Sequence, residues 1–195
     1  MKPSASLGLQ VLALLWAALP AFASAGADPK AKTSIPKIAR FGEVQIGYST
    51  QEDLAKRWGE GKIITGGHPN SGRLWRVKGT PWVLRTDGFD YSERGLVVDA
   101  VEIEASPGAS ADIPYAKLPA RSFAWLGRIK LGMPQAKAMK FLRSRAMPST
   151  PTKEGCKLAA QGSYALETNV RLRTWTARLD FTDGILRRLA LEAVE

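Results

Sequence analysis

The stretch Ile46–Leu54 reads IGYSTQEDL, and a related stretch, LGMPQAKAM, follows at Leu131–Met139. In both, an aliphatic residue precedes Gly, residues that can open a helix come next, and an apolar residue follows at the same offset. Trp, Phe and Gly then follow in the same order, at Trp82, Phe89 and Gly95 in the first copy and at Trp175, Phe181 and Gly184 in the second. Each copy of an internal repeat folds as one supersecondary unit. The sequence therefore predicts a tandem repeat.

Each copy predicts a helix followed by antiparallel strands. Ser49 and Glu52 have the spacing of a capping box, and Gly59 is expected to end the first helix. Pro134 is expected at the first position of the second helix, where its missing amide costs nothing, with a long loop after that helix. Alternating apolar and polar residues predict strands at 74–77, 82–85, 96–103, 172–181 and 185–194. The predicted class is α+β, a tandem repeat of a helix and an antiparallel sheet with one face open, and Trp75, Trp82, Trp125 and Trp175 are expected in its core.

Five segments are expected along the chain. Residues 1–25 combine a basic start, an apolar run at Leu7–Leu19 and small residues before a cleavage point, which is the pattern of a signal peptide. A flexible N-terminal arm at 26–37, the first repeat at 38–104, a linker rich in Pro, Ala and Ser at 105–122 and the second repeat at 123–195 follow. No later run approaches the roughly 20 apolar residues of a spanning helix. We expect an exported protein without a transmembrane segment, periplasmic or fully secreted.

Three short motifs resemble those of a known family. They are Ile46-Gly47-Tyr48-Ser49 with Asp53-Leu54 and Gly59, Leu131-Gly132-Met133-Pro134 with Met139, and Leu179-Asp180-Phe181-Thr182-Asp183-Gly184-Ile185. As an ordered, duplicated set they resemble the β-lactamase inhibitor protein-like fold, which the small lipoprotein subunit of the outer-membrane β-barrel assembly machine also uses. The resemblance implies binding rather than catalysis, to a partner enzyme in the inhibitors and to proteins and lipid in the lipoprotein. The chain lacks the inhibitor's disulfides and a lipid-bearing cysteine, so the resemblance extends to the fold alone.

Charge is distributed unevenly between the two copies. The net charge is +10, with 9 Lys or Arg against 10 Asp or Glu from Ile38 to Glu104 and 15 against 7 from Ala105 to Glu195. A basic half in an exported protein favours an anionic envelope component or an acidic protein over nucleic acid, and a basic surface that aids solubility is the alternative. The candidate residues for binding anionic lipid or polyanion are Lys137, Lys140, Arg143 and Arg145, which are expected on the outward face of the second helix.

Two polar segments of the first copy, at 66–73 and 86–91, have no counterpart in the second. Polar insertions between strands commonly carry function. The candidate binding residues in these segments are His68, Arg73, Asp87, Asp90 and Tyr91, because Tyr and Arg are favoured where a surface binds a protein. An enzymatic hypothesis pairs His68, the only histidine, with Asp87 or Asp90 as general base and adds Ser71 or a bound water as nucleophile. The alternative is an ordinary loop histidine, and the sequence has no nucleophile elbow, phosphate loop or zincin helix.

The sequence predicts no metal site and no cofactor. The acids between Asp87 and Glu104 do not follow a calcium-loop spacing, and one His and one Cys cannot complete a zinc site. Cys156 is expected to be a minor loop thiol, with a dimer link or a reactive thiol as alternatives.

The leading functional hypothesis is a non-catalytic module that binds an envelope or secreted protein through open sheet faces and first-copy loops, as an inhibitor or an envelope-assembly accessory. The alternative is an anionic-lipid or polyanion binder that uses the basic second copy. The third hypothesis is a small hydrolase centred on His68. The identity of the partner, the oligomeric state and the joining of the two sheets into one surface do not follow from the sequence.

Overall fold

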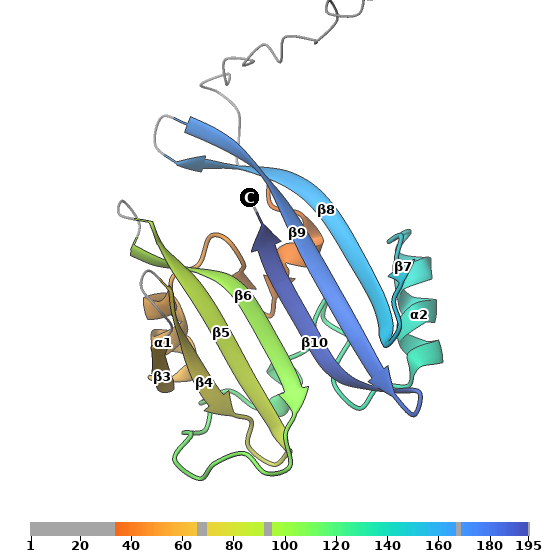
Figure 1. Ribbon diagram of the computed structural model, residues 1–195, viewed down its shortest axis with the longest axis horizontal. Coiled ribbons are helices and arrows are strands. Elements are labelled where there is room, and N and C mark those ends of the chain that lie inside the picture. The colour runs from red at the N-terminus through yellow and green to blue at the C-terminus, as the bar shows by residue number, and fades with distance from the viewer. Residues whose placement is uncertain (1–33, 66–69, 92–94, 167–168, 195) are drawn as a thin grey trace, which may run out of the picture.

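The computed structural model describes residues 34–65, 70–91, 95–166 and 169–194. The expected signal peptide, residues 26–33 of the expected arm and His68 lie outside the described residues. The described chain is an α+β protein built on one antiparallel sheet (Figure 1). None of its described helices has the length and apolar character that crossing a membrane requires.

In the first half of the chain, one α-helix precedes four strands. The elements are η1 (Lys37–Ala39), β1 (Arg40–Phe41), β2 (Val44–Gln45), α1 (Gln51–Trp58), β3 (Lys62–Thr65), β4 (Asn70–Arg76), β5 (Trp82–Tyr91) and β6 (Gly95–Ala105). The capping box of α1 is formed by Thr50 and Asp53. The expected box of Ser49 and Glu52 is therefore wrong by one residue, because the Ser49 hydroxyl accepts a hydrogen bond from the amide of Gln45 instead.

The second half also places one α-helix before four strands, and its described residues form no short strands that correspond to β1 and β2. It contains η2 (Ala120–Ser122), α2 (Gln135–Ser144), β7 (Thr150–Pro151), β8 (Gly155–Leu166), β9 (Asn169–Thr182) and β10 (Ile185–Val194). Pro134 is the N-cap of α2, so the helix begins one residue later than expected. The expected long loop after α2 is wrong, because most of it forms β8. Its Ala and Gly residues have weak strand propensity, and pairing with β9 along the whole of β8 stabilises it.

A single sheet joins both halves. Its strand order is β3-β4-β5-β6-β10-β9-β8-β7, so the last strands of the two halves meet at the centre. Leu189 of β10 lies opposite Ile103 of β6, and both are buried. The two predicted sheets are therefore one continuous surface.

The segments before the two α-helices make the same contacts. The amide of Gly47 donates to the Val98 carbonyl at 2.6 Å, and the amide of Gly132 donates to the Leu186 carbonyl at 2.9 Å. Both glycines have positive φ, 80° and 82°, which L side chains rarely adopt. Each half thus ties the start of its helix to its own central strand.

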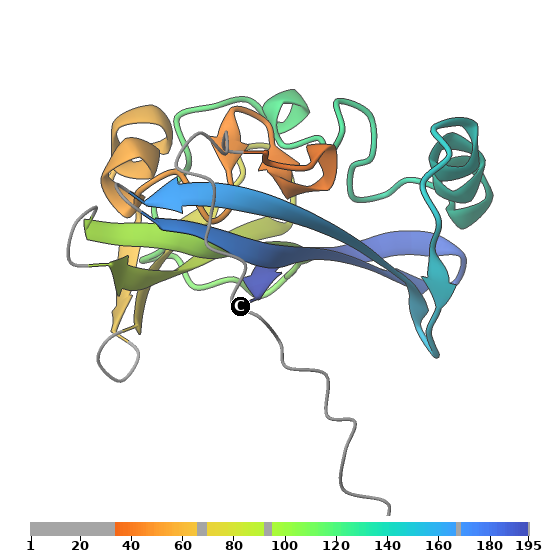
Figure 2. The same ribbon diagram turned by 90° about the horizontal axis from the view of Figure 1, so that it is seen from above.

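The described helices lie on one side of the sheet (Figure 2). Trp75, Trp125 and Trp175 are buried there, as expected, whereas Trp82 is only partly buried. The indole of Trp125 donates to the Ile38 carbonyl at 3.0 Å and that of Trp175 donates to the Ile46 carbonyl at 2.7 Å. The N-terminal segment is therefore fixed beneath the second half of the sheet.

The segment expected as a linker at 105–122 packs against the fold. Ile113 and Ala116 are buried, and Tyr115 forms a parallel bridge with Arg76 at the end of β4. The guanidinium of Arg76 donates to the Ile113 carbonyl at 2.7 Å and lies 4.2 Å from the centre of the Tyr115 ring. The connection between the two halves is therefore held in place rather than free.

Candidate functional site

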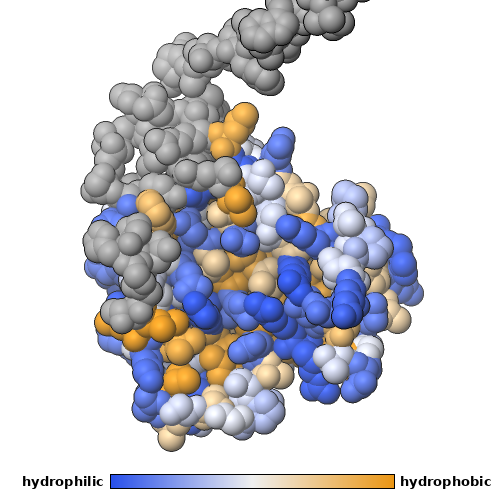
Figure 3. Space-filling model, in the orientation of Figure 1, coloured by the Kyte–Doolittle hydropathy of each residue, from blue (hydrophilic) through white to orange (hydrophobic). Residues whose placement is uncertain are grey.

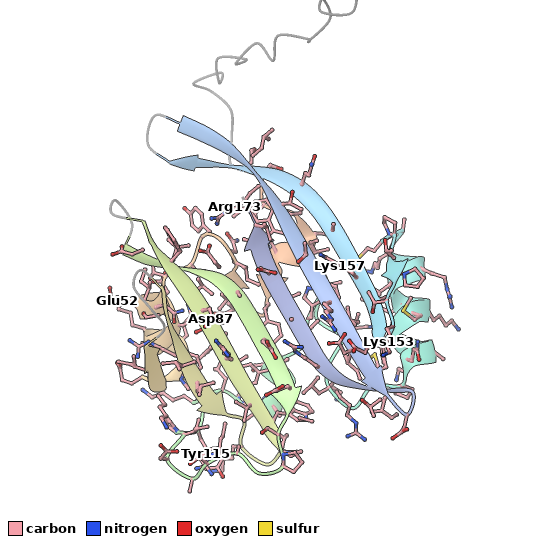
Figure 4. The ribbon with its side chains drawn as sticks, viewed as in Figure 1. Glu52, Asp87, Tyr115, Lys153, Lys157 and Arg173 are labelled. Carbon is pink, nitrogen blue, oxygen red and sulfur yellow. The ribbon has the colours of Figure 1, made fainter. Side chains whose placement is uncertain are left out.

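The side of the sheet opposite α1 and α2, which we call the open face, carries most of the charged strand residues. Cross-strand partners point to the same face, so the register assigns one row across the centre of the sheet. The row runs Leu74, Arg85, Glu102, Ala190, Arg178 and Lys157. Figure 4 labels Asp87 and Lys157, which lie on β5 and β8. Within the described residues no helix covers this face.

Ion pairs connect the charges of the open face. Arg188 of β10 donates to both carboxylate oxygens of Glu102 on β6, at 2.6 and 2.9 Å, and so joins the two halves. Arg178 donates to Asp180 at 2.8 Å and also pairs with Glu154. Hydrogen bonds to these carboxylates raise the pKa of Arg178 and Arg188 above an already high value. Both side chains are therefore cations at every pH at which the protein folds.

The same short motif supplies an ion pair to each half. Residues 82–87 read WVLRTD and residues 175–180 read WTARLD. In each, Arg donates to the Asp two residues later, at 3.0 Å between Arg85 and Asp87 and at 2.8 Å between Arg178 and Asp180. The two arginines share one row, three strand spacings or about 14 Å apart. Sequence reasoning missed this repeat, although the common offset from Trp was a visible signal.

A shallow groove of about 350 Å³ lies at one corner of the open face. Its apolar residues are Leu74, Val83 and Ile113, and its charged residues are Arg85, Glu102 and Glu104. The groove forms where the chain after β6 passes over the ends of β4 and β5.

Exposed apolar residues lie at the opposite end of the open face. Phe89 is 40% exposed, Leu172 81% and Val194 42%. The space-filling view shows hydrophilic side chains across the middle of this face and hydrophobic ones near its lower left and upper ends (Figure 3). The open face thus combines a polar centre with apolar margins.

A second surface is formed by a segment without acidic residues. From Ile113 to Lys153 the chain has nine Lys or Arg and no Asp or Glu. All nine are exposed, and none forms an ion pair with another residue that the structure describes. We call this set the cationic layer: Lys117, Arg121, Arg128, Lys130, Lys137, Lys140, Arg143, Arg145 and Lys153.

The structure separates the candidate residues of the first copy. Arg73 lies on the covered side, where it pairs with Glu60 and with the carbonyl of that residue. Asp87 lies on the open face and pairs with Arg85. Asp90 is exposed near the end of β5, Tyr91 is the last residue of that strand, and His68 lies outside the described residues. Because side chains alternate along a strand, Arg73 and Asp87 cannot contribute to one site.

The candidate binding residues of the second copy all lie on α2 or at its C-terminal end. Lys137, Lys140 and Arg143 are exposed on α2, and Arg145 follows the helix, with its guanidinium 5.5 Å from the centre of the Phe141 ring. Within α2 only Ala138 and Leu142 are buried.

Of the residues named in the hydrolase hypothesis, Ser71 lies opposite Gly88 in the register, on the side of the sheet away from Asp87 and on the same side as Asp90, while His68 lies outside the described residues. Over residues 34–65, 70–91, 95–166 and 169–194, no three His, Cys, Asp or Glu side chains are grouped so that they could hold a metal ion.

Cys156 is not the loop thiol that was expected. It lies on β8, is buried beneath α2, and places its Sγ 3.6 Å from Sδ of Met139. Burial raises the pKa of the thiol, which keeps it protonated and unreactive near neutral pH.

Comparison of the chain with protein-family models, curated proteins and solved structures gives no match.

Proposed function

We propose that the chain is a non-catalytic module that binds a protein partner through the open face of its sheet. The repeated Trp-x-x-Arg-x-Asp motif carries this proposal. Exposed ion pairs contribute only about 0–1 kcal/mol to stability, so folding does not require the same pair at matching positions of both halves. A binding surface that uses both halves explains the repetition better.

The size of the open face supports a protein partner. Six strands span about 24 Å, and ten residues of a strand span about 33 Å, so their face covers about 800 Å². A standard protein interface buries about 800 Å² on each partner. Arginine is enriched in such interfaces, and the open face holds fixed arginines at its centre, while exposed apolar side chains such as Leu172 add non-polar area.

The proposal includes the origin of the two halves. The repeated order of one helix and four strands, the matching contacts of Gly47 and Gly132, and the repeated motif support a tandem repeat of the β-lactamase inhibitor protein-like kind. The leader-like pattern at 1–25 supports export, and hence a partner in the envelope or outside the cell.

A substitution at the centre of the open face tests the function. Ala190 lies between Glu102 and Arg178 in the row across the open face and is only partly buried. We expect Ala190→Tyr to reduce partner binding at least tenfold and to leave the thermal midpoint within a few degrees. Ala136→Tyr, on the outward side of α2, is the matched control and should bind normally.

The measurement is a pull-down from envelope extract in high salt, followed by affinity measurement with the captured protein. A partner retained by wild type and Ala136→Tyr but lost from Ala190→Tyr supports the open face. Equal retention by all three proteins contradicts it.

A further inference from the structure

The outward side of α2 is a stripe of cations. With about 100° between successive residues, Lys140 lies about 180° from the direction shared by the buried Ala138 and Leu142. Lys137 and Arg143 lie about 60° to either side of Lys140. The three charges therefore all point away from the sheet, and no acidic residue of the helix offsets them.

The connection before α2 extends this surface. Trp125 and Arg128 close a turn in which the Arg128 amide donates to the Trp125 carbonyl at 3.1 Å. Leu126 and Gly127 at its tip both have positive φ, 52° and 72°. A leucine in this region is strained, and strain of this kind often marks a functional segment. The turn places a half-buried leucine next to the exposed Arg128.

Apolar groups accompany the cations on α2 as well. Phe141 is only partly buried, and the guanidinium of Arg145 lies over its ring. Leu126 and Phe141 pack partly against the core of the protein, and their remaining surface lies beside the cations, where it is accessible to the interface of a lipid bilayer.

We propose that the cationic layer binds the surface of an anionic lipid bilayer. The charges are exposed and form no ion pair with a residue that the structure describes, so they are available to lipid phosphates, and each Lys or Arg near such a surface increases affinity about fivefold. Because α2 and the open face lie on opposite sides of the sheet, a membrane-bound molecule would present its open face away from the bilayer. This inference does not depend on the proposed protein partner.

The test uses the whole chain and sedimentation with vesicles. One set contains phosphatidylcholine and phosphatidylglycerol in a ratio of about 7 to 3, and the other contains phosphatidylcholine alone. The neutral vesicles measure any binding through the apolar run Leu7–Leu19. We expect binding to anionic vesicles to exceed binding to neutral ones, and to fall at least tenfold as salt is raised from about 0.05 to 0.3 M, because salt screens exposed charges.

Two triple variants that lose equal charge separate the cationic layer from net charge. Lys137→Gln/Lys140→Gln/Arg143→Gln should lose most anionic binding, by roughly 100-fold if all three cations contact the surface. Lys78→Gln/Lys157→Gln/Arg187→Gln alters exposed cations outside the cationic layer and should bind within threefold of wild type. Thermal midpoints verify that both variants fold.

Equal losses in the two triple variants would overturn the proposal, because net charge alone would then explain binding. Binding of wild type to soluble polyphosphate without preference for anionic vesicles would overturn the bilayer as the occupant. Neither result depends on Ala190, so the outcome is separate from that of the pull-down.

Discussion

The open face and helix α2, which carries Lys137, Lys140 and Arg143 of the cationic layer, lie on opposite sides of one sheet, and the two surfaces use charge in opposite ways. Arg85, Arg178, Arg188 and Lys157 on the open face are accompanied by Asp87, Glu102, Glu104, Asp180 and Glu192. The cationic layer has nine basic residues and no acid between Ile113 and Lys153. The net charge of +10 therefore comes largely from the cationic layer, although the sheet strands are rich in charge too.

The charges of the open face form ion pairs with one another, whereas the charges of the cationic layer are available to a ligand. A paired arginine such as Arg188 has a defined position and a carboxylate on its guanidinium, which suits specific contact with a shaped protein surface. Lys140 is exposed and pairs with no described residue, and a compact charge on a flexible stem suits a diffuse anionic surface. The two surfaces are therefore expected to differ in salt dependence and in specificity.

The largest expected effect is a loss of stability when the packing of α2 against the sheet is weakened. Leu142 is fully buried and is the larger of the two buried side chains of α2. We expect Leu142→Ala to lower the free energy of unfolding by about 3 kcal/mol, measured by urea denaturation, because it removes buried methyl groups and leaves a cavity. Reaction of Cys156 with a thiol reagent should accelerate, since α2 covers that side chain.

Leu142→Met is the control for this change. It conserves volume and should cost less than about 1.5 kcal/mol. A loss below 1 kcal/mol in Leu142→Ala, with no change in thiol reactivity, would mean that α2 is held mainly by other contacts.

An intermediate effect on stability is expected when the ion-paired Glu102 is neutralised, and it is compared with the effect of neutralising Lys140. Glu102→Gln weakens the two hydrogen bonds from Arg188, and because the two side chains are 24% and 41% exposed we expect a loss of only about 1 kcal/mol. Lys140→Gln should change stability by less than about 0.5 kcal/mol, since no described residue pairs with it. A double-mutant cycle with Arg188→Gln measures the coupling, and a coupling energy of zero would remove the distinction between the two surfaces.

The smallest expected effect is a pH dependence of the free energy of unfolding that comes from the N-terminal cap of α1 and has no counterpart in α2. A hydrogen bond from the Thr50 amide lowers the pKa of Asp53 in the capping box of α1, whereas Pro134 gives α2 no side-chain cap. A lowered pKa means that the cap stabilises the fold at neutral pH, and that this contribution disappears as the pH falls through the Asp53 pKa. We expect Asp53→Asn to cost about 0.5–1 kcal/mol at pH 7.

Urea denaturation at several pH values checks this sign. The difference in stability between wild type and Asp53→Asn should shrink as the solution becomes acidic. A difference that stays constant down to pH 3 would show that the charge of Asp53 contributes nothing.

Local patterns predicted much of the fold and less of the site. The starts of α1 and α2 were expected within one residue, because Gly, cap residues and apolar spacing act over a few positions. The strand β8 was missed, because Ala and Gly carry little intrinsic strand signal and long-range pairing with β9 decides the outcome. The separation of Arg73 from Asp87 was missed as well, because the two segments had been interpreted as loops, where alternation does not apply.

By itself, the sequence determined the α+β class, the two helices, the strands β4, β5, β6, β9 and β10, and the basic character of the second half, because periodicity, capping and composition are properties of neighbouring residues. Only the tertiary structure decided that β6 and β10 join the halves into one sheet, that Glu102 meets Arg188, and that the cations of α2 lie opposite the open face. These outcomes depend on register between segments far apart in the chain, and a shift of one residue in a strand would exchange its two faces.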